Sequence, residues 1–470
     1  MNSENNIKKP LSLISLVIII LYLISFININ YYIAGINIRQ IDIFSDIKTE
    51  NGNTQLNDNI NFETQYQSTI SAAQINPLAS LINLIGLLKT ENVALNNSPA
   101  QGVRTPLIGN TKQLSFFFDA LKNSKTKPVR IAHYGDSAIE GDLITADIRD
   151  ELQKRFGGNG VGWLGIVSQD ITFRTTTKHS FSDNWESAAL YTNNPKGLPL
   201  GISGEIAIPK GNAWVQYETT RSRRSLKDFS VVKLYYANAK NSQIFYTFDG
   251  GAKQSAQLKT GSGIQELILK PTGKAKVVKL EFPLADQAYF YGVSLENESG
   301  LYIDNLPLRG NTGVDIGQIS QTMLKDFAKY LDYKLIILEF GLNIAGSSKT
   351  DYSWYEREML KVINHLKQAF PRTSIIMISV HDKSMKKGSN FVTDPTILRL
   401  LETQKNIAKQ ADVALWSVFD AMGGENSMPK WVNANPPLAF KDYIHFNDQG
   451  AAKIAQLFLE SLISEFDRYK

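Results

Sequence analysis

The fold of this chain is indicated by residues 129–156, which read VRIAHYGDSAIEGDLITADIRDELQKRF. The first part, Val129–Tyr134, is a short apolar run that is typical of a buried strand. A helical face follows, because apolar residues recur at steps of four or five, at Ile139, Leu143, Ile148, Leu152 and Phe156. Two glycines directly after this helix, which we expect over Ile139–Phe156, end the pattern. A strand, a turn and a helix in succession predict the first unit of an α/β fold, with Ser137 at the turn.

The carboxyl-terminal part of the chain repeats this alternation of strands and helices. Short apolar strands are expected at Leu335–Phe340, Ser374–Val380 and Val413–Val418. Helical patterns lie between and after them, at Ile316–Leu331, Tyr355–Phe370, Thr396–Gln410 and Gln449–Phe466. Strands that alternate with helices predict a three-layer α/β/α domain, whose parallel sheet is covered on both faces.

The segment between these two regions has a different pattern. From about residue 169 to residue 298 there is almost no helical periodicity, and strand-like runs are separated by turns. The clearest runs are Ala213–Thr219, Val231–Ala237, Ile244–Phe248 and Lys276–Phe282. Asp249-Gly250-Gly251 is a strong hairpin signal. We therefore expect a β-sandwich over 169–298, inserted into the α/β domain.

The amino terminus has the pattern of an export signal. Two lysines precede an apolar run from Leu11 to Phe26, and such a basic flank is expected to stay in the cytoplasm. No small-residue cleavage site follows, because bulky tyrosines stand at positions 31 and 32. We therefore predict an uncleaved transmembrane helix that leaves the rest of the chain outside the cytoplasmic membrane. A cleaved signal peptide and a buried core helix are the alternatives.

The expected organisation has five parts. After the anchor, residues 46–74 are rich in Asn, Gln, Thr and Ser, which suits a tether, and Pro77–Leu88 is an apolar helical patch. The parts are the anchor or signal at 1–35, the tether with its accessory helix at 36–105, the first part of the α/β domain at 106–168, the sandwich at 169–298 and the second part of the α/β domain at 299–470.

The composition of the 470 residues is that of a globular protein. Hydrophobic residues make up 43% and charged residues 20%, which excludes a fibrous or wholly disordered chain. A formal net charge of +5 is small for this length and argues only weakly for nucleic acid. The absence of cysteine excludes disulfides, thiol catalysis and cysteine-ligated metals. The five histidines form no H-x-x-x-H pair, so we expect no zinc site and no cofactor.

Ser137 is the first residue that points to chemistry. It ends the segment His133-Tyr134-Gly135-Asp136-Ser137 and so lies at the carboxyl edge of the predicted sheet, where open α/β folds bind ligands. The start of the following helix favours negative charge that develops near the serine. A serine hydroxyl needs a base to become a good nucleophile. Without that base, Gly-Asp-Ser is an ordinary turn.

A base for Ser137 is offered by Asp442-Tyr443-Ile444-His445, just before the last helix. Asp442 stands three residues before His445, so one loop can hold the carboxylate against one ring nitrogen while the other nitrogen faces the serine. Such a contact fixes the imidazole tautomer and stabilises the imidazolium. Taken alone, the same residues form an ordinary loop that leads into a helix.

Two further loops can supply donors for negative charge. Asn343 ends Glu339-Phe340-Gly341-Leu342-Asn343, after a predicted strand, where its carboxamide can donate to an oxyanion. Gly310 lies in Leu308-Arg309-Gly310-Asn311, before a helix, and offers a backbone N–H. Both sequences are common in loops, so each is weak evidence by itself.

Together these residues resemble the SGNH (GDSL-type) hydrolase family. That family has a serine first, then a glycine, then an asparagine in Gly-x-Asn, and finally Asp-x-x-His near the carboxyl terminus. The same order here is Ser137, Gly310, Asn343, Asp442 and His445. The resemblance implies that Ser137 is the nucleophile, His445 the general base and Asp442 its orienting partner. It also implies an oxyanion hole made by the N–H groups of Ser137 and Gly310 and the side chain of Asn343.

A narrower resemblance covers residues 125–465. The segments IAHYGDSAIEGD at 131–142 and FGGNGVGW at 156–163 are similar to the exported bacterial branch that includes peptidoglycan O-acetylesterases. Members of this branch carry a β domain like a carbohydrate-binding module between the serine and glycine blocks, where the predicted sandwich lies here. Ala138 departs from the pattern, because many relatives carry a polar residue after the serine. The departure puts one hydrogen bond in doubt but not the nucleophile.

Other polar residues near these blocks have simpler interpretations. Glu140 and Asp142 are expected in the first turns of a helix, where carboxylates complement the helix dipole. His133 precedes the serine on a buried strand and is expected to be a core histidine. His381 and Asp382 follow another strand and are candidates for contacting the substrate, although a structural role is favoured.

The predicted sandwich also carries residues that invite a functional interpretation. Trp185 and Trp214 are candidates for stacking on sugar rings, although burial of a tryptophan in a sandwich core is commoner. A solvated loop is expected for the basic cluster of Arg221, Arg223 and Arg224.

We therefore expect a membrane-anchored serine esterase, acting in the periplasm or outside the cell, that removes O-acetyl or similar short acyl groups from a cell-wall or surface glycan. Its partners would be the acylated glycan and the cytoplasmic membrane, and not nucleic acid. An O-acetyltransferase with the same acyl-enzyme and a non-catalytic glycan-binding protein on the same scaffold are the alternatives.

Overall fold

The computed structural model describes most of the chain after residue 101. The described residues are 102–469 without 169–170, 172–173, 193, 285–286 and 347–350, together with the backbone of 31–33 and 36–38. The last two segments are β1 (Tyr31–Ile33) and β2 (Ile36–Ile38), which pair in antiparallel fashion.

The segments predicted at the amino terminus cannot be compared with the structure, because they lie outside the described residues. The apolar run from Leu11 to Phe26, the tether at 46–74 and the helical patch at Pro77–Leu88 lie outside the described residues. Among the residues that are described, no helix combines the length and the apolar character that crossing a membrane requires.

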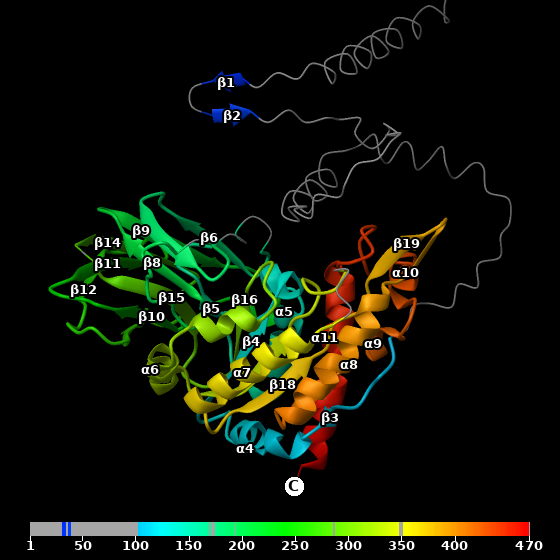
Figure 1. Ribbon diagram of the computed structural model, residues 1–470. Coiled ribbons are helices and arrows are strands. Elements are labelled where there is room, and N and C mark those ends of the chain that lie inside the picture. Colours follow the sequence, from blue (N-terminus) through cyan, green and yellow to red (C-terminus); the bar gives the residue numbers. More distant parts are fainter. Residues whose placement is uncertain are drawn as a thin grey trace, which may run out of the picture. The chain divides into compact units, whose positions relative to one another are not determined.

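A six-stranded sheet forms the centre of the α/β domain (Figure 1). Its strands, in spatial order, are β16 (Gly300–Pro307), β4 (Pro128–Gly135), β17 (Tyr333–Glu339), β18 (Ser374–Ile378), β21 (Ala414–Trp416) and β3 (Ile108–Gly109). The first five run parallel and β3 pairs antiparallel with β21. Four of the parallel strands coincide with predicted apolar runs, whereas β16 was not predicted.

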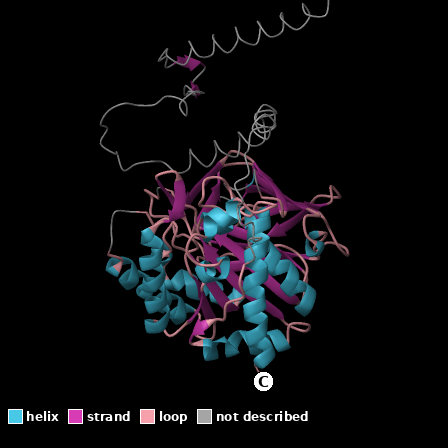
Figure 2. Cartoon of the chain, turned by 90° about the vertical axis from the view of Figure 1, so that its right-hand side faces the viewer, coloured by secondary structure: helices cyan, strands magenta, loops and turns pink. Residues whose placement is uncertain are grey.

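Helices cover both faces of this sheet (Figure 2). Successive side chains of a strand point to opposite faces, so each strand contributes to the core on both sides. Ile131 of β4 belongs to the core under one set of helices, and Ala132 belongs to the core under the other set. The first set is α4 (Ser115–Lys122), α5 (Thr145–Phe156), α9 (Val418–Met422), α10 (Ser427–Val432) and α11 (Asp448–Arg468). The second set is α6 (Gln321–Leu331), α7 (Ser353–Ala369) and α8 (Pro395–Gln410). The arrangement is the predicted α/β/α order of layers.

Two helices begin later than the sequence pattern predicts. The helix expected from Ile139 begins at Thr145, and a 3-10 turn, η2 (Ser137–Asp142), precedes it. The backbone is left-handed at Gly141, Asp142 and Ile144, with φ of +68°, +72° and +59°, which breaks any helix. The helix expected from Ile316 is likewise divided into η5 (Val314–Gln318) and α6.

The inserted region is a sandwich of two antiparallel sheets. One sheet contains β7 (Trp185–Ala189), β8 (Glu205–Pro209), β10 (Val231–Ala237), β13 (Gln265–Leu269) and β15 (Tyr289–Glu296), with β5 (Gly162–Leu164) paired to β15. The other contains β6 (Thr177–Phe181), β9 (Ala213–Thr219), β11 (Gln243–Phe248), β12 (Gln254–Gln257) and β14 (Val277–Leu284). Because β5 belongs to this sheet, the sandwich includes residues from the range 106–168 that was expected for the α/β domain.

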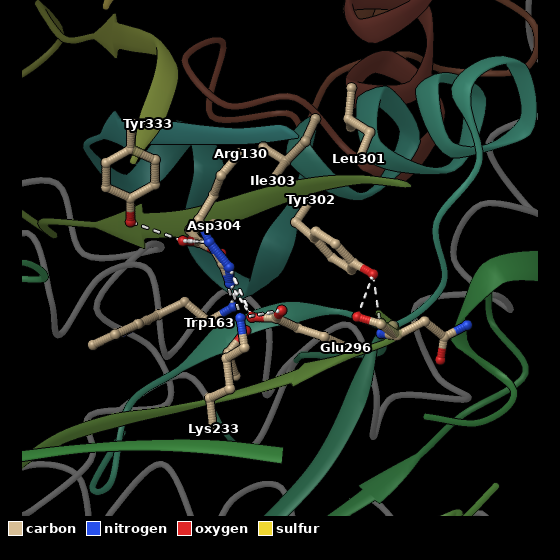
Figure 3. Close-up of polar contacts among 12 residues, drawn as sticks. Arg130, Trp163, Lys233, Glu296, Leu301, Tyr302, Ile303, Asp304 and Tyr333 are labelled. Carbon is tan, nitrogen blue, oxygen red and sulfur yellow. Dashed lines mark hydrogen bonds and ion pairs between the residues drawn. The ribbon is translucent and has the colours of Figure 1, made fainter. Parts of the chain in front are cut away.

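A buried ionic cluster joins the sandwich to the central sheet (Figure 3). Arg130 of β4 donates from Nη1 to Glu296 Oε1 of β15 at 2.8 Å, and its Nε lies 3.3 Å from Asp304 Oδ2 of β16. Lys233 Nζ of β10 lies 3.0 Å from Glu296 Oε2, and the Tyr333 hydroxyl donates to Asp304 Oδ2 at 2.8 Å. Two positive and two negative side chains therefore balance one another. Burial alone would lower the pKa of Arg130, but Asp304 and Glu296 outweigh it and keep the guanidinium charged.

Candidate active site

Three of the five predicted site residues follow directly from the order of strands. Ser137 comes after β4, Gly310 after β16 and Asn343 after β17, and these three strands are neighbours in the sheet. The carboxyl ends of parallel strands meet at one edge, so the three loops converge there. His445 comes from the loop before α11 and reaches the same edge, because its ring contacts Ser137.

A continuous chain of contacts links the predicted nucleophile, the predicted base and the carboxylate predicted to orient that base. Ser137 Oγ lies 3.4 Å from His445 Nε2, and His445 Nδ1 lies 2.8 Å from Asp442 Oδ2. Only the first contact is long, as is common for nucleophile–base pairs without substrate. The His445 and Asp442 side chains are 19% and 29% exposed. The group therefore lies at a solvent-accessible rim where a large substrate can reach it.

The loop that carries Asp442 and His445 is shaped by the carboxylate itself. Asp442 Oδ1 accepts hydrogen bonds from the backbone N–H groups of Ile444 at 2.9 Å and His445 at 3.1 Å. Tyr443, between them, has a left-handed backbone with φ of +60°. Burial would raise the pKa of Asp442, but the hydrogen bond and charge of His445 and the two N–H groups outweigh it and lower this pKa. Asp442 is therefore a carboxylate at neutral pH.

His381 holds this loop, and Asp382 holds two neighbouring segments. His381 Nε2 donates to the carbonyl of Ile444 at 2.8 Å, and burial lowers the pKa of His381 to about 4, so the ring is neutral. Asp382 accepts from the N–H of Met428 at 2.8 Å and from the hydroxyl of Thr393 at 2.8 Å. Both side chains are buried. Their surroundings favour the structural role over contact with substrate.

The predicted oxyanion donors differ in how they are engaged. The N–H of Ser137 begins η2 and so has no acceptor inside that turn. Gly310 has φ of +71°, a left-handed conformation that a glycine adopts freely, and it is exposed at the rim. Asn343 Nδ2 donates to the carbonyl of Asn311 at 2.9 Å and to Asp136 Oδ2 at 3.3 Å. Donation from Asn343 to an oxyanion therefore requires it to share or leave its longer bond with Asp136.

Asp136 is a site residue that the sequence analysis did not single out. It is buried behind Ser137, and its Oδ1 accepts from the N–H of Ala138 at 3.0 Å. Burial, with a smaller contribution from the charge of Glu339, raises the pKa of Asp136 to about 7, although the N–H of Ala138 opposes this. The Gly-Asp-Ser turn was a signal for it, because an aspartate in front of a helical turn commonly caps that turn.

A buried polar group lies directly under this turn. His133 Nε2 lies 3.0 Å from Glu339 Oε2, and His133 Nδ1 lies 3.0 Å from the Thr145 hydroxyl. Asn305 Nδ2 donates to the same hydroxyl at 2.9 Å and to the carbonyl of Ile139 at 3.0 Å. His133 is thus a core histidine with partners on both ring nitrogens, as its place on the strand predicts. The group fixes the backbone of η2 from β4, β16 and β17.

Glu140 and Asp142 do not complement a helix dipole as expected, because α5 begins only at Thr145. Glu140 Oε1 lies 3.3 Å from Arg309 Nη1, next to Gly310, and so joins the serine turn to the loop of a predicted oxyanion donor. Asp142 instead accepts two hydrogen bonds of 2.7 Å from Arg149. Both carboxylates are buried and set the path of the turn that follows Ser137.

The candidate residues of the sandwich take structural positions. Trp185 packs edge-on against Phe282 and Phe290 of the sandwich core, and the ring of Trp214 lies under the ammonium of Lys279 at 5.0 Å. In the basic cluster Arg221 and Arg224 are exposed, as expected of a solvated loop, but two of its members also make specific contacts. Arg223 Nε lies 2.8 Å from Asp147 Oδ1 of α5, and Arg224 Nη2 donates to the carbonyl of Asp150 at 3.0 Å. These contacts fasten the sandwich to the α/β domain, because α5 presents acidic side chains to it. No group of three or more His, Asp or Glu side chains in the described part of the chain could hold a metal ion.

Comparison with known proteins reveals similarity in fold. No protein-family model and no curated protein sequence matches the chain. A solved structure described as a peptidoglycan O-acetylesterase in action is 20% identical, with a TM-score of 0.64, and the match covers 77% of this chain and 99% of that one. The predicted resemblance is therefore confirmed for the fold.

Two further solved structures match less closely. A family two carbohydrate esterase from Cellvibrio japonicus is 9% identical over 62% of this chain and 100% of that one, with a TM-score of 0.26. A salicylyl-acyltransferase from a tetracycline biosynthetic pathway is 14% identical over 64% and 97%, with a TM-score of 0.29. Scores this low do not distinguish between esterase and acyltransferase.

Proposed function

We propose that this chain is a serine esterase that removes O-acetyl groups from a cell-wall or surface glycan through an acyl-enzyme. The observation that carries the proposal is the set of contacts from Ser137 Oγ through His445 to Asp442, at 3.4 and 2.8 Å. This set lies at the rim of the sheet beside two loops that offer hydrogen-bond donors, Gly310 and Asn343. The fold shared with a solved peptidoglycan O-acetylesterase supports the class of substrate.

Acylation begins when Ser137 Oγ attacks the carbonyl carbon of the acetyl ester. His445 Nε2 takes the hydroxyl proton, and the Asp442 carboxylate stabilises the imidazolium that forms. The carbonyl oxygen becomes an oxyanion, which the N–H groups of Ser137 and Gly310 and the amide of Asn343 stabilise. The intermediate collapses when the C–O bond to the sugar breaks and His445 returns its proton to the sugar oxygen.

Deacylation repeats these steps with water. His445 takes a proton from a water molecule that attacks the acetyl carbonyl, and the second intermediate releases acetate as Ser137 recovers its proton. The neutral ring of His381 stays outside this proton transfer and holds the loop of His445 through the carbonyl of Ile444, and the buried Asp382 accepts hydrogen bonds from other segments. The chain's own residues therefore supply every group that this two-step mechanism needs.

The proposed location is outside the cytoplasmic membrane. It rests on the sequence alone, namely the two lysines and the apolar run from Leu11 to Phe26. Alkaline phosphatase fused after residue 105 is expected to be active in cells and to sediment with membranes. Activity only in the soluble exported fraction would indicate a cleaved signal, and no activity would contradict export.

The proposal is tested with purified protein and O-acetylated peptidoglycan fragments. We expect the wild type to release acetate and Ser137→Ala to release none, while both proteins keep the same melting temperature. A serine-directed organophosphonate is expected to label Ser137 in the wild type only.

The outcomes of this test separate the proposal from its alternatives. Acetate release by Ser137→Ala at the wild-type rate would disprove the nucleophile. Transfer of acetyl groups to added oligosaccharide in preference to water would identify an acetyltransferase. Binding of the fragments without acetate release or labelling would identify a glycan-binding protein.

A further inference from the structure

A two-stranded hairpin lies beside the loop that carries His445. Its strands are β19 (Ser384–Lys387) and β20 (Asn390–Thr393), which pair in antiparallel fashion. In Figure 1 strand β19 of the hairpin lies at the upper right of the α/β domain, away from the C-terminus. The hairpin follows the carboxyl end of β18, so it starts from the same edge of the sheet as the site.

The hairpin is held against that loop by specific contacts. The N–H of Ser384 donates to the carbonyl of Tyr443 at 3.0 Å. The rings of Phe391 and Tyr443 stack with centroids 3.7 Å apart and an angle of 8° between their planes. At the base, the Thr393 hydroxyl donates to the buried Asp382 at 2.8 Å. Because Tyr443 stands between Asp442 and His445, these contacts fix the hairpin relative to the proposed base.

Lysines occupy the exposed part of this hairpin. Lys386 is paired with Phe391 across the hairpin, so it lies on the same face as the ring that stacks on Tyr443. Lys387 pairs with Asn390 at the tip and so lies on the other face of the hairpin, and both lysines are exposed. Lys441, beside Asp442, is also exposed. Exposed lysines therefore stand on both faces of the hairpin and next to Asp442 in the sequence.

The acidic groups near this rim do not neutralise these lysines. Asp442 is paired with His445, and the oxygens of Asp382 accept hydrogen bonds inside the base of the hairpin. Asp394 accepts from the N–H and hydroxyl of Thr396 at the start of α8. Glu425 is exposed, but it precedes Asn426, which contacts the base of the hairpin and not its tip.

We propose that Lys386 and Lys387 form a subsite for carboxylate groups of the glycan, so that the substrate is an acidic polymer. This inference rests on the proposed esterase function. A glycan that presents its acetyl group to Ser137 must continue along the rim, where exposed ammonium groups attract carboxylates. Lysines on an exposed strand edge can also serve only to prevent pairing with another strand. The experiment below distinguishes this protective role from the binding of carboxylates.

The experiment compares two charge reversals that are matched in size. Lys386→Glu/Lys387→Glu changes the hairpin, and Lys125→Glu/Lys127→Glu changes two exposed lysines that precede β4, at the other end of the sheet. Each protein is assayed on O-acetylated peptidoglycan fragments and on the same fragments whose carboxylates have been converted to amides. Rates of acetate release give kcat and KM for each form.

We expect the hairpin variant to raise KM for the acidic fragments about tenfold, with kcat unchanged, because exposed charge pairs contribute modestly to binding and not to the reaction step. Added salt should reduce this difference. KM for the amidated fragments should change less than twofold, and the Lys125 and Lys127 variant should behave like the wild type. Equal KM values of the wild type for the two forms, or equal effects of the two variants, would overturn the subsite and leave the esterase intact. Failure of the wild type on both forms would overturn the proposed function instead.

Discussion

The two ends of strand β4 carry polar clusters of opposite character. At its start, Arg130 and Glu296 have side chains that are only 6% and 1% exposed, and every charge has a partner of opposite sign. At its end, Ser137 leads to His445 and Asp442, whose side chains are 19% and 29% exposed. A sealed cluster, which is buried and in which every charge is paired, has no group left to bind a substrate or exchange a proton, so its role is structural. An open cluster with a long contact can still accept a proton or a substrate, so the comparison separates the residues that hold the fold from those proposed to act.

The largest effect on the open end is expected from Asp442→Asn. The asparagine oxygen can still accept the N–H groups of Ile444 and His445, but its amide nitrogen would face His445 Nδ1 and force the wrong tautomer. Loss of such a carboxylate lowers kcat by about 10⁴-fold in comparable serine enzymes. Steady-state acetate release measures this effect, and urea unfolding should show only a small loss of stability, because the lowered pKa of Asp442 reflects a modest stabilisation of the folded protein. Asp448→Asn, in the first turn of α11, is the control and should keep full activity.

The sealed end should respond to Arg130→Met in the opposite manner. The change leaves Glu296 and Asp304 buried without their main partner, which costs about 3–5 kcal/mol of unfolding free energy. The protein that remains folded should keep its kcat, because Arg130 lies at the far end of β4 from Ser137. Lys233→Met removes a more exposed partner of Glu296 and should cost less. If the two variants lose equal stability, the cluster does not clamp the sandwich to the sheet.

Asn343→Ala tests whether the open end includes the predicted oxyanion donor. Removal of one such donor costs about 10²–10³ in kcat. The loss should appear in kcat with little change in KM, because the donor acts on charge that develops during the reaction. Asn433→Ala, an exposed asparagine that donates to Pro429, is a matched control. A loss confined to KM would show that Asn343 binds the substrate and does not stabilise the oxyanion.

The sequence predicted the open end better than the sealed end. Ser137, Asn343, Asp442 and His445 could be placed because each follows a recognisable strand or precedes a recognisable helix. The contacts of Arg130 could not be predicted, because its partner Glu296 lies 166 residues away in the sequence. Their meeting depends on how β15 and β16 are placed in their sheets. The strand β16 was missed altogether, and pairing that depends on distant segments leaves little local signal.

Local backbone geometry accounts for the remaining differences. The left-handed residues Asp142 and Ile144 delay α5, although the apolar pattern begins at Ile139. Non-glycine residues rarely adopt this conformation, so composition does not reveal it. Tyr443 shows the same effect in the loop of His445. The sequence therefore predicts which site residues come together. The turns that orient these residues depend on contacts such as those of Asp442 and Asp136, which the sequence does not reveal.

Asp136 combines features of both clusters, because it is buried like Arg130 and yet adjoins Ser137. The variant Asp136→Asn tests which of the two clusters it resembles. Its pKa of about 7 exceeds the ordinary value of 3.8, so between pH 4 and pH 7 the folded protein binds a proton that the unfolded chain has lost. Stability from this group should therefore fall as pH rises through that window, by up to about 1.4 kcal/mol per pH unit. His381, with its pKa lowered to about 4, acts in the opposite direction but equally in both proteins. Urea unfolding from pH 5 to pH 7.5 should show that the stability of the wild type relative to Asp136→Asn declines with pH. A difference that stays constant would mean that Asp136 is ionised throughout and belongs with the open cluster.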